Sequence, residues 1–393
     1  MGVDRRGVLA GLVGAGLAAP VWAKERRQAR IAKVEAFAVP GAVFVKVSAE
    51  DGASGWGEAG HSGGAYVAAL INAEAGKLLK GADVFAAEPA WARLFYEWDE
   101  LGPGGVASQA LAGIDCALWD LRGRLLDQPV YNLLGGAHRL RFPVYGSFSR
   151  DNGDGTYKSP EACAAQAQEL AAEGFKTLKV RLAIREENAD PDPDPALPVL
   201  RAVRKAVGDA VTLYVDANNG YRPAQAIRIG KALAAECGVT VLEEPVAAYH
   251  YPSLAQVAGA LDLDIAAGEH EYTRWAFRDL ILQGRPDVLN PDVSKLAGLS
   301  EARKVAALAE AFDLPIAVHN ARPTLLSAAH AHFVASASTA TRPQEHPGRE
   351  RLAQLWRYFD RRLSAEGGFF SVPEGPGLGL NVDEAAVRKA VRT

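Results

Sequence analysis

A repeated pattern, in which a short apolar run ends in an acidic or basic residue, constrains the fold of this chain most strongly. The most distinctive copy spans residues 240–246, where a run with two β-branched residues ends in Glu243, Glu244 and Pro245. The other copies end in Asp216, Glu269, Asp292 and His319. From Asp216 through Glu243 to His319, successive end residues are 27, 26, 23 and 27 positions apart, which suits the β/α unit of a barrel. The repeat therefore predicts an α/β fold of parallel strands with helices between them.

The chain is longer than one ordinary domain. Its 393 residues leave room for a barrel and a second, smaller domain. A formal net charge of −4, with no basic patch beyond the N-terminus, argues against a partnership with nucleic acid. Cys116, Cys163 and Cys237 are too few and too irregular for a disulfide framework or a zinc site, so we expect them to be buried as small hydrophobic residues.

The first 23 residues resemble an export signal. Asp4-Arg5-Arg6 precede an uncharged run over 7–23 that is short for a membrane span and ends in small residues at positions 21 and 23. The arginine pair is similar to that of twin-arginine signals, which export folded proteins. We therefore predict a twin-arginine-type signal peptide over 1–23, a periplasmic protein and no stable membrane span. A cytoplasmic protein, or one anchored to the membrane by an uncleaved N-terminus, is the alternative.

The segment over 30–140 has the pattern of a separate α+β domain. Strands are expected over 29–39 and 42–48, with a return strand near Gly55–Glu58 after a turn at Asp51-Gly52. A helix over 106–126 carries an apolar stripe that has to pack on another element, and the barrel is the candidate. We expect the barrel over 141–365, followed by a C-terminal segment over 366–393 that returns to the first domain.

The strand expected over 176–182 carries two cations on one face. Strict alternation with apolar residues places Lys179 and Arg181 on the same side of the strand. Because the helix layer of a barrel is apolar, these cations have to face the lumen, where they need anionic partners. The acidic, proline-rich stretch over 186–195 predicts an exposed, stiff loop to which we assign no chemistry.

Three acidic residues end consecutive predicted strands. Asp216, Glu243 and Glu269 would converge at the barrel face where active sites of this fold lie. Three desolvated carboxylates cannot all stay ionised without a cation, and oxygen ligands without histidine or cysteine favour Mg²⁺ over zinc or iron. Taken singly, each residue has a structural alternative, such as capping a turn or a helix, or pairing with an arginine.

Together these residues resemble the enolase superfamily, specifically its mandelate racemase subgroup. In the barrel the resemblance is carried by Asp216-Ala217-Asn218, Glu243-Glu244-Pro245, Gly268-Glu269, Pro291-Asp292 with Lys295, and His319. Outside it, the similar segments are Gly55–Ala59, Gly113–Asp115, Ala117–Asp120 and Pro129–Gly136. The resemblance covers roughly residues 30–390. It implies a modified TIM barrel, (β/α)7β, with an N-terminal α+β capping domain, one Mg²⁺, and a reaction that begins by removing the proton α to a carboxylate.

The resemblance also implies a role for each residue. Mg²⁺ held by Asp216, Glu243 and Glu269 would take the substrate carboxylate and stabilise the enediolate. His319 would be the base, with Asp292 holding its imidazole, and the structural alternative for His319 is a buried core histidine. Glu345 would be the carboxylic acid that donates a hydrogen bond to the substrate carboxylate, and Glu244 would support the site or form a salt bridge.

The pair Lys179 and Arg181 departs from the two lysines that are usual in the family. Arginine stays protonated, so Arg181 is a poor base and a good anchor for an anion. Only His319 then looks competent as a base, and one base suffices for β-elimination of water. We predict a homo-oligomeric, Mg-dependent acid-sugar dehydratase that makes a 2-keto-3-deoxy acid from a small carboxylate substrate. A racemase or epimerase of a 2-hydroxy acid, favoured by Lys179, and a periplasmic ligand-binding protein without catalysis are the alternatives.

Overall fold

The computed structural model describes residues 29–60, 63–347 and 353–391. The predicted export signal over 1–23 lies outside these residues. In the described part of the chain, no helix has the length and apolar character that crossing a membrane requires. The three cysteines are buried and free there, as expected.

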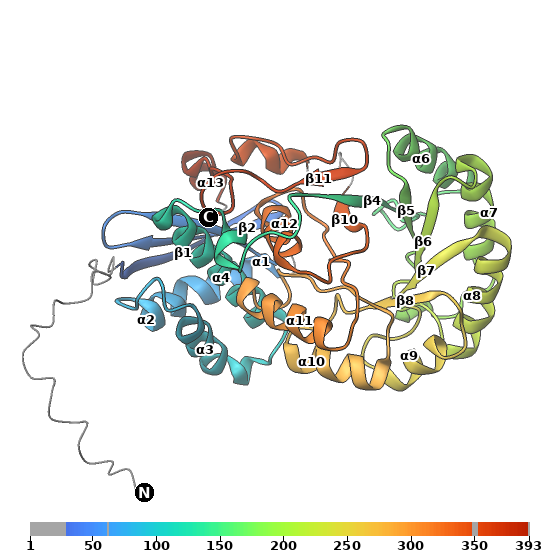
Figure 1. Cartoon of the computed structure of the whole chain (residues 1–393), viewed down its shortest axis with the longest axis horizontal. Helices are drawn as coiled ribbons and strands as arrows, with labels where there is room; N and C mark the ends of the chain where they lie inside the picture. The colour runs from blue at the N-terminus through green and yellow to red at the C-terminus, as the bar shows by residue number, and fades with distance from the viewer. Residues whose placement is uncertain (1–28, 61–62, 348–352, 392–393) are drawn as a thin grey trace, which may run out of the picture.

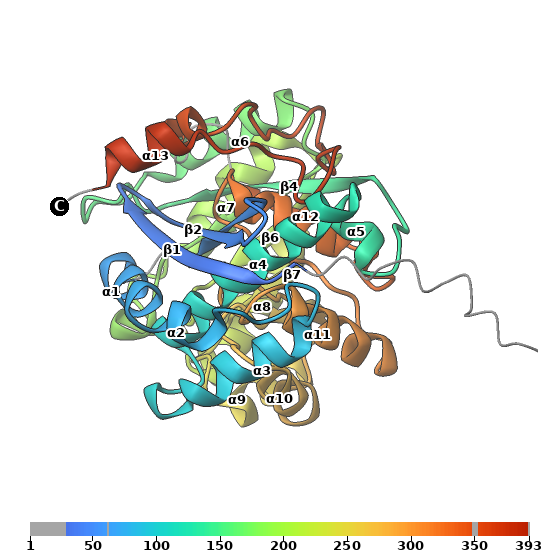
Figure 2. The same cartoon turned by 90° about the vertical axis from the view of Figure 1, so that its left-hand side faces the viewer.

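The N-terminal part combines one antiparallel sheet with helices. The sheet has the order β1-β2-β3, and its strands are β1 (Ile31–Val39), β2 (Ala42–Ala49) and β3 (Ser54–Ala59). The helices that follow are α1 (Gly64–Leu70), η1 (Ile71–Ala75), α2 (Gly76–Leu79), α3 (Ala87–Glu97), η2 (Asp99–Leu101), α4 (Gly105–Leu126) and α5 (Val130–Leu133). This part lies to the left in Figure 1 and faces the viewer in Figure 2.

Two glycines of β3 let the long helix α4 lie directly on the sheet. A Cβ atom at Gly55 would overlap the backbone of Leu121, and one at Gly57 would overlap the carbonyl of Gly113. Close approach of two backbones is a recognised reason for glycine within a strand. The other side of α4 contacts the barrel, because Asp115 accepts hydrogen bonds of 2.8 and 2.6 Å from the amide and hydroxyl of Ser300.

The second part is a curled sheet surrounded by helices (Figure 1). Its parallel strands follow the order β10-β4-β5-β6-β7-β8-β9, and they are β4 (Arg141–Ser149), β5 (Thr177–Arg181), β6 (Thr212–Asp216), β7 (Val239–Glu243), β8 (Asp264–Ala267), β9 (Val288–Leu289) and β10 (Gln344–Pro347). The main helices are α6 (Pro160–Ala172), α7 (Ala196–Val207), α8 (Pro223–Cys237), α9 (Tyr251–Ala258), α10 (Arg274–Asp279), α11 (Leu299–Ala311) and α12 (Leu325–Ser336). Shorter turns are η3 (Glu186–Asn188), η4 (Leu280–Gly284) and η5 (Ala353–Tyr358). The predicted fold class, a modified TIM barrel with an N-terminal capping domain, is confirmed.

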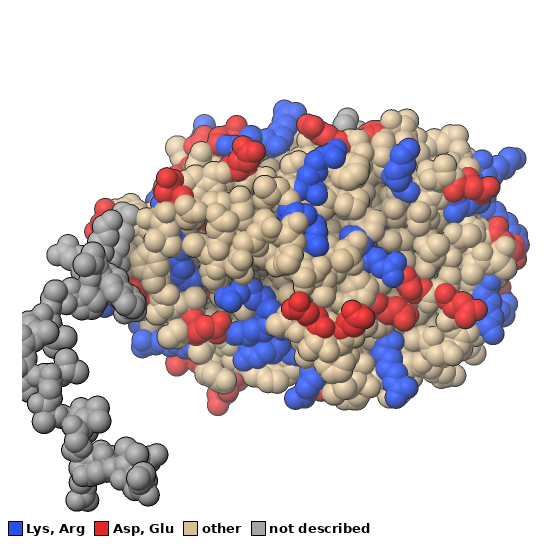
Figure 3. Space-filling model, in the orientation of Figure 1, with Lys and Arg blue, Asp and Glu red and all other residues tan. Residues whose placement is uncertain are grey.

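The chain returns to the N-terminal sheet at its end. Strand β11 (Phe369–Ser371) pairs antiparallel with β4, and helix α13 (Glu384–Ala390) packs beside β1. Lys46 of β2 forms an ion pair of 2.6 Å with Glu384 of this helix. On the face shown in Figure 3, basic and acidic side chains are interspersed, so no extended surface of one sign marks that side.

The run over 316–318 is not a regular strand, which differs from the predicted repeat. It touches β9 through a single bridge between Leu289 and Ile316, where the amide of Ala317 donates to the carbonyl of Leu289 at 3.0 Å. On its other side, the side chain of Gln344 supplements a single backbone hydrogen bond, from the amide of Glu345 to the carbonyl of Val318 at 3.4 Å. Its Nε2 donates to the carbonyl of Ile316 at 3.0 Å, and its Oε1 accepts from the amide of Val318 at 2.8 Å.

The lumen of the barrel has an apolar floor beneath a charged layer. The floor is a buried cluster of Tyr145, Tyr214, Val241, Ala266, Val288 and Ala317. Asp216 follows Tyr214 by two positions on β6, and Glu243 follows Val241 by two positions on β7. Since side chains two positions apart share one face of a strand, both acids point into the lumen directly above the floor.

The buried His332 of α12 makes fold stability depend on pH. Burial lowers the pKa of His332 to about 4, because the charged ring would lose its hydration. The unfolded chain, with a pKa near 6.5, therefore binds a proton first as the pH falls. The stability that neutral His332 contributes is complete above pH 6.5 and is lost as the pH drops towards 4.

We expect this loss to reach about 2 kcal/mol at pH 5 relative to pH 7. In His332→Asn, the Oδ1 atom can still accept the amide of Tyr131, which donates to Nδ1 of His332 at 3.2 Å. Urea unfolding of both proteins at pH 7 and pH 5 provides the measurement. The variant should lose less stability between the two pH values, and equal losses would contradict the assignment.

Candidate active site

The ends of β5, β6 and β7 bring charged side chains into register. Arg181 lies opposite Asp216, and Asp216 lies opposite Glu243, in the parallel ladders. Glu269 follows β8 after Gly268, whose φ of +133° and close neighbour, the ring of Phe277, leave no room for a side chain. The backbone thus delivers three acids to the same end of the barrel.

Lys179 is buried among carboxylates in the lumen. Its Nζ atom lies 2.6 Å from Oε1 of Glu243 and 3.2 Å from Oε1 of Glu345, and its side chain is 1% exposed. Burial disfavours the ammonium, but these carboxylates outweigh it and raise the pKa of Lys179 well above its ordinary value. The predicted anionic partners of Lys179 are present, and the residue is held as a cation.

Arg181 is more open than Lys179. Its Nε atom lies 3.6 Å from Oδ2 of Asp216, and its side chain is 22% exposed. Asp216 also accepts hydrogen bonds from the amide and the side-chain nitrogen of Asn218, at 2.7 and 2.8 Å. Arg181 therefore presents a cation at the edge of the charged layer, where an anion can reach it.

Glu345 lies on β10 rather than at a strand end. Burial would raise its pKa, but Lys179 and His319 outweigh burial, so the pKa of Glu345 is lowered. Its Oε2 accepts the amide of Asn320 at 3.1 Å. The lowered pKa favours the ionised form of Glu345, whereas the resemblance implies an acid that donates to the substrate, and that role stays a prediction.

His319 and Asp292 form a short hydrogen-bonded pair. The Nδ1 atom of His319 lies 2.7 Å from Oδ2 of Asp292, while Oδ1 of Asp292 accepts from the amide and hydroxyl of Ser294 at 2.8 and 2.7 Å. Burial disfavours imidazolium, but Glu269 and Asp292 outweigh it and raise the pKa of His319. The Nε2 atom lies 3.4 Å from Oε2 of Glu269, so the free nitrogen faces the acids at the barrel mouth.

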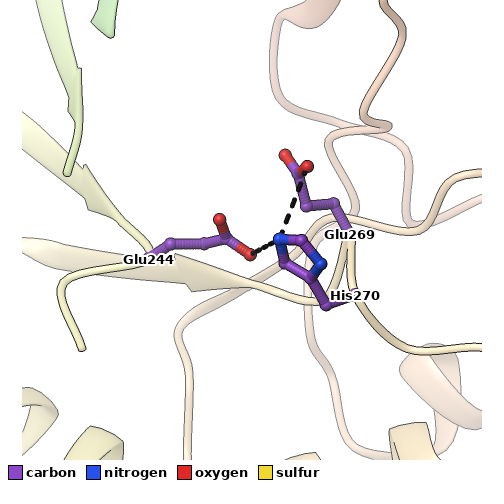
Figure 4. A group of neighbouring side chains, drawn as sticks. All are labelled: Glu244, Glu269 and His270. Atoms are coloured by element: carbon purple, nitrogen blue, oxygen red, sulfur yellow. Dashed lines mark ion pairs between the residues drawn. The ribbon is translucent and has the colours of Figure 1, made fainter. Parts of the chain in front are cut away.

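A second histidine joins the site, and sequence reasoning missed it. The Nε2 atom of His270 lies 3.4 Å from Glu244 and 3.8 Å from Glu269 (Figure 4). Glu244 is buried with an unusual φ of +43° and accepts a hydrogen bond of 3.1 Å from Asn219. This agrees with the expected salt-bridging role of Glu244. The one available signal for His270 was its position directly after Glu269.

These residues open onto a cavity of about 660 Å³ between the two parts of the molecule. The barrel contributes Arg181, Glu269, Lys295 and His319 to its wall, and the N-terminal part contributes Gly63, Val106 and Gln109. Arg185 and Glu187 also line it, so the loop after β5, to which the sequence analysis assigned no chemistry, reaches the cavity. Lys295 lies 3.1 Å from Glu269.

The donor atoms suit a hard divalent cation. Burial raises the pKa of Asp216 and of Glu243 despite the adjacent cations, so a further cation bound by these carboxylates would favour their ionised forms. Asp216, Glu243 and Glu269 offer carboxylate oxygens only, which favours Mg²⁺-like ions. Among the described residues, a tighter group with ligand atoms within 4.8 Å of one another is Glu244, Glu269 and His270.

Comparisons with known proteins agree along nearly the whole chain. Residues 11–135 match the mandelate racemase / muconate lactonizing enzyme N-terminal domain, and residues 162–386 match the enolase C-terminal domain-like family. A D-galactarolactone cycloisomerase from Agrobacterium fabrum is 32% identical, covering 88% of this chain and 90% of the relative. A D-galactonate dehydratase from Variovorax paradoxus is 33% identical, and the match covers 89% of this chain and 91% of that relative. A mandelate racemase/muconate lactonizing protein from Paracoccus denitrificans, solved with magnesium, has a TM-score of 0.86 at 34% identity, covering 92% of this chain and 98% of that chain.

Removal of the Lys179 charge should destabilise the fold. In Lys179→Met, Glu243 and Glu345 keep their burial and lose their shared cation, so the free energy of unfolding at pH 7 should fall by about 3–5 kcal/mol. The control is Lys176→Met, at an exposed position just before the same strand. This variant should change the free energy of unfolding by less than about 0.5 kcal/mol. Urea titration measures both, and equal small losses would show that Lys179 does not neutralise the buried acids.

Proposed function

Because the chain belongs to the mandelate racemase/muconate lactonizing enzyme family of the enolase superfamily, we propose that it dehydrates a sugar acid. The reaction removes the proton α to the substrate carboxylate and the hydroxyl on the next carbon, and it yields water and a 2-keto-3-deoxy acid. The observation that carries this proposal is the pairing of one competent base, His319, with two cations that cannot serve as a second base.

A divalent metal is implied by membership in the superfamily, and we infer that the metal is Mg²⁺ bound by Asp216, Glu243 and Glu269. When bound, it supplies positive charge to the substrate carboxylate and to the negative charge that develops on deprotonation. The oxygen-only donor set supports this choice, as does the magnesium found with the Paracoccus denitrificans relative.

The proton transfers can be assigned to atoms of His319. Asp292 is hydrogen-bonded to Nδ1, which leaves Nε2 to take the α-proton of the substrate. Asp292 accepts from Nδ1 throughout and stabilises the imidazolium that forms. The same Nε2–H then gives its proton to the departing hydroxyl, so His319 ends neutral and one water leaves.

Racemisation needs a base on each face of the α-carbon. Lys179 is held as a cation by Glu243 and Glu345, and Arg181 stays protonated at any useful pH. Arg181, which lines the cavity, instead suits an anchoring role towards the substrate carboxylate and the charge that develops on it, whereas the buried Lys179 neutralises Glu243 and Glu345. This is why we favour elimination over epimerisation, although both begin with the same proton abstraction.

A panel of aldonic and aldaric acids in D₂O distinguishes the candidate reactions. We expect a 2-keto-3-deoxy product from at least one of these acids, detected as its semicarbazone and by proton NMR, with activity that depends on Mg²⁺. Exchange of the α-proton without a keto product would favour a racemase or epimerase. Neither exchange nor product across the panel would favour a binding protein.

His319→Asn should abolish turnover without disturbing metal binding. The loss of the base should lower kcat by at least about 10²–10⁴-fold. Calorimetric titration with Mg²⁺ should give the same affinity within about threefold, since His319 is not among the proposed ligands. The matched control is His138→Asn at an exposed histidine, which should leave kcat unchanged. Retained activity in His319→Asn would remove the base from this account.

A further inference from the structure

A third histidine lies behind the His319–Asp292 pair and has no part in the proposed proton transfers. His330 projects from α12, a helix that is buried along its length, and its side chain is 3% exposed. Its Nε2 atom lies 3.0 Å from the amide nitrogen of Val293 and 3.4 Å from Oδ1 of Asp292. Its Nδ1 atom is buried and has no hydrogen-bond partner among the described residues.

One ring nitrogen cannot accept from Val293 and donate to Asp292 at the same time. The contact with Val293 is a hydrogen bond in which the backbone amide donates, so Nε2 carries the lone pair and the proton resides on Nδ1. With this assignment, no hydrogen lies between Nε2 of His330 and Oδ1 of Asp292, which are 3.4 Å apart. The bond to Val293 is the shorter of the two contacts, at 3.0 Å against 3.4 Å, so His330 holds the backbone next to Asp292.

The turn that carries Asp292 is fixed from two sides. From within, Oδ1 of Asp292 accepts from the amide and hydroxyl of Ser294. From outside, His330 accepts the intervening amide of Val293, which is buried and would otherwise lose its acceptor. With both bonds in place, Oδ2 of Asp292 is left for Nδ1 of His319 at 2.7 Å.

We propose that His330 is a positioning residue for the base. Its Nε2 atom fixes the turn over 292–294 so that Asp292 meets His319, and it does so without touching the substrate. This inference deepens the proposed function. Only the turnover measurement depends on that function, because the geometry of the His319–Asp292 pair can be measured without a substrate.

The test compares two substitutions at the same buried position. His330→Gln places Oε1 close to the position of Nε2 and keeps an acceptor for Val293, whereas His330→Leu fills similar space without one. The matched control is His332→Asn, at the other buried histidine of α12, which contacts the amide of Tyr131 instead. Thermal unfolding and circular dichroism establish that each variant is folded.

The first readout is the low-field proton NMR resonance of the hydrogen bond between His319 and Asp292, assigned by its loss in His319→Asn. We expect wild type, His330→Gln and His332→Asn to keep this resonance, and His330→Leu to lose it or shift it upfield. A resonance in His330→Leu that matches wild type would overturn the proposal, whatever reaction the protein catalyses.

The second readout is turnover of the substrate found in the acid panel. We expect kcat of His330→Leu to fall about 10–100-fold, by analogy with residues that orient a catalytic ligand from behind, with KM and Mg²⁺ affinity little changed. His330→Gln should recover kcat to within about threefold of wild type. Equal losses in both variants would show that the acceptor at this position does not decide turnover, and would overturn the proposal.

Discussion

The charged layer at the top of the barrel lumen depends on the neutralisation of buried carboxylates. Asp216, Glu243 and Glu345 are almost fully buried, and isolated charges in such surroundings would cost several kcal/mol each. Lys179 offsets part of this cost by contacting two of them, and Arg181 contacts the third. Burial nevertheless keeps the pKa values of Asp216 and Glu243 raised, and a divalent cation bound by these carboxylates would stabilise their ionised forms.

Much of this arrangement follows from the sequence because it is local. The alternation of side chains on β5 and β6 places Lys179, Arg181 and Asp216 in the lumen, and the spacing of strand ends brings Glu243 and Glu269 to the same face. These features need only the register of a strand and the parallel direction of its neighbours. For the same reason the fold class could be predicted from the repeat and the resemblance together.

The remaining features depend on contacts between distant segments. The side chain of Gln344 supports the backbone before His319 in place of a strand, and no local pattern signals that substitution. Gln109 reaches the cavity only because α4 docks on the barrel. Glu244, which pairs with His270, has a positive φ that a glutamate rarely adopts and that propensity therefore does not predict.

The position of the bound metal distinguishes between two acidic groups, because both of them include Glu269. Crystals soaked in Mn²⁺, a substitute for Mg²⁺ with a strong anomalous signal, would locate the ion in an anomalous difference map. We expect one peak bounded by the carboxylates of Asp216, Glu243 and Glu269. A peak bounded instead by Glu244, Glu269 and His270, or no peak at either group, would contradict this expectation.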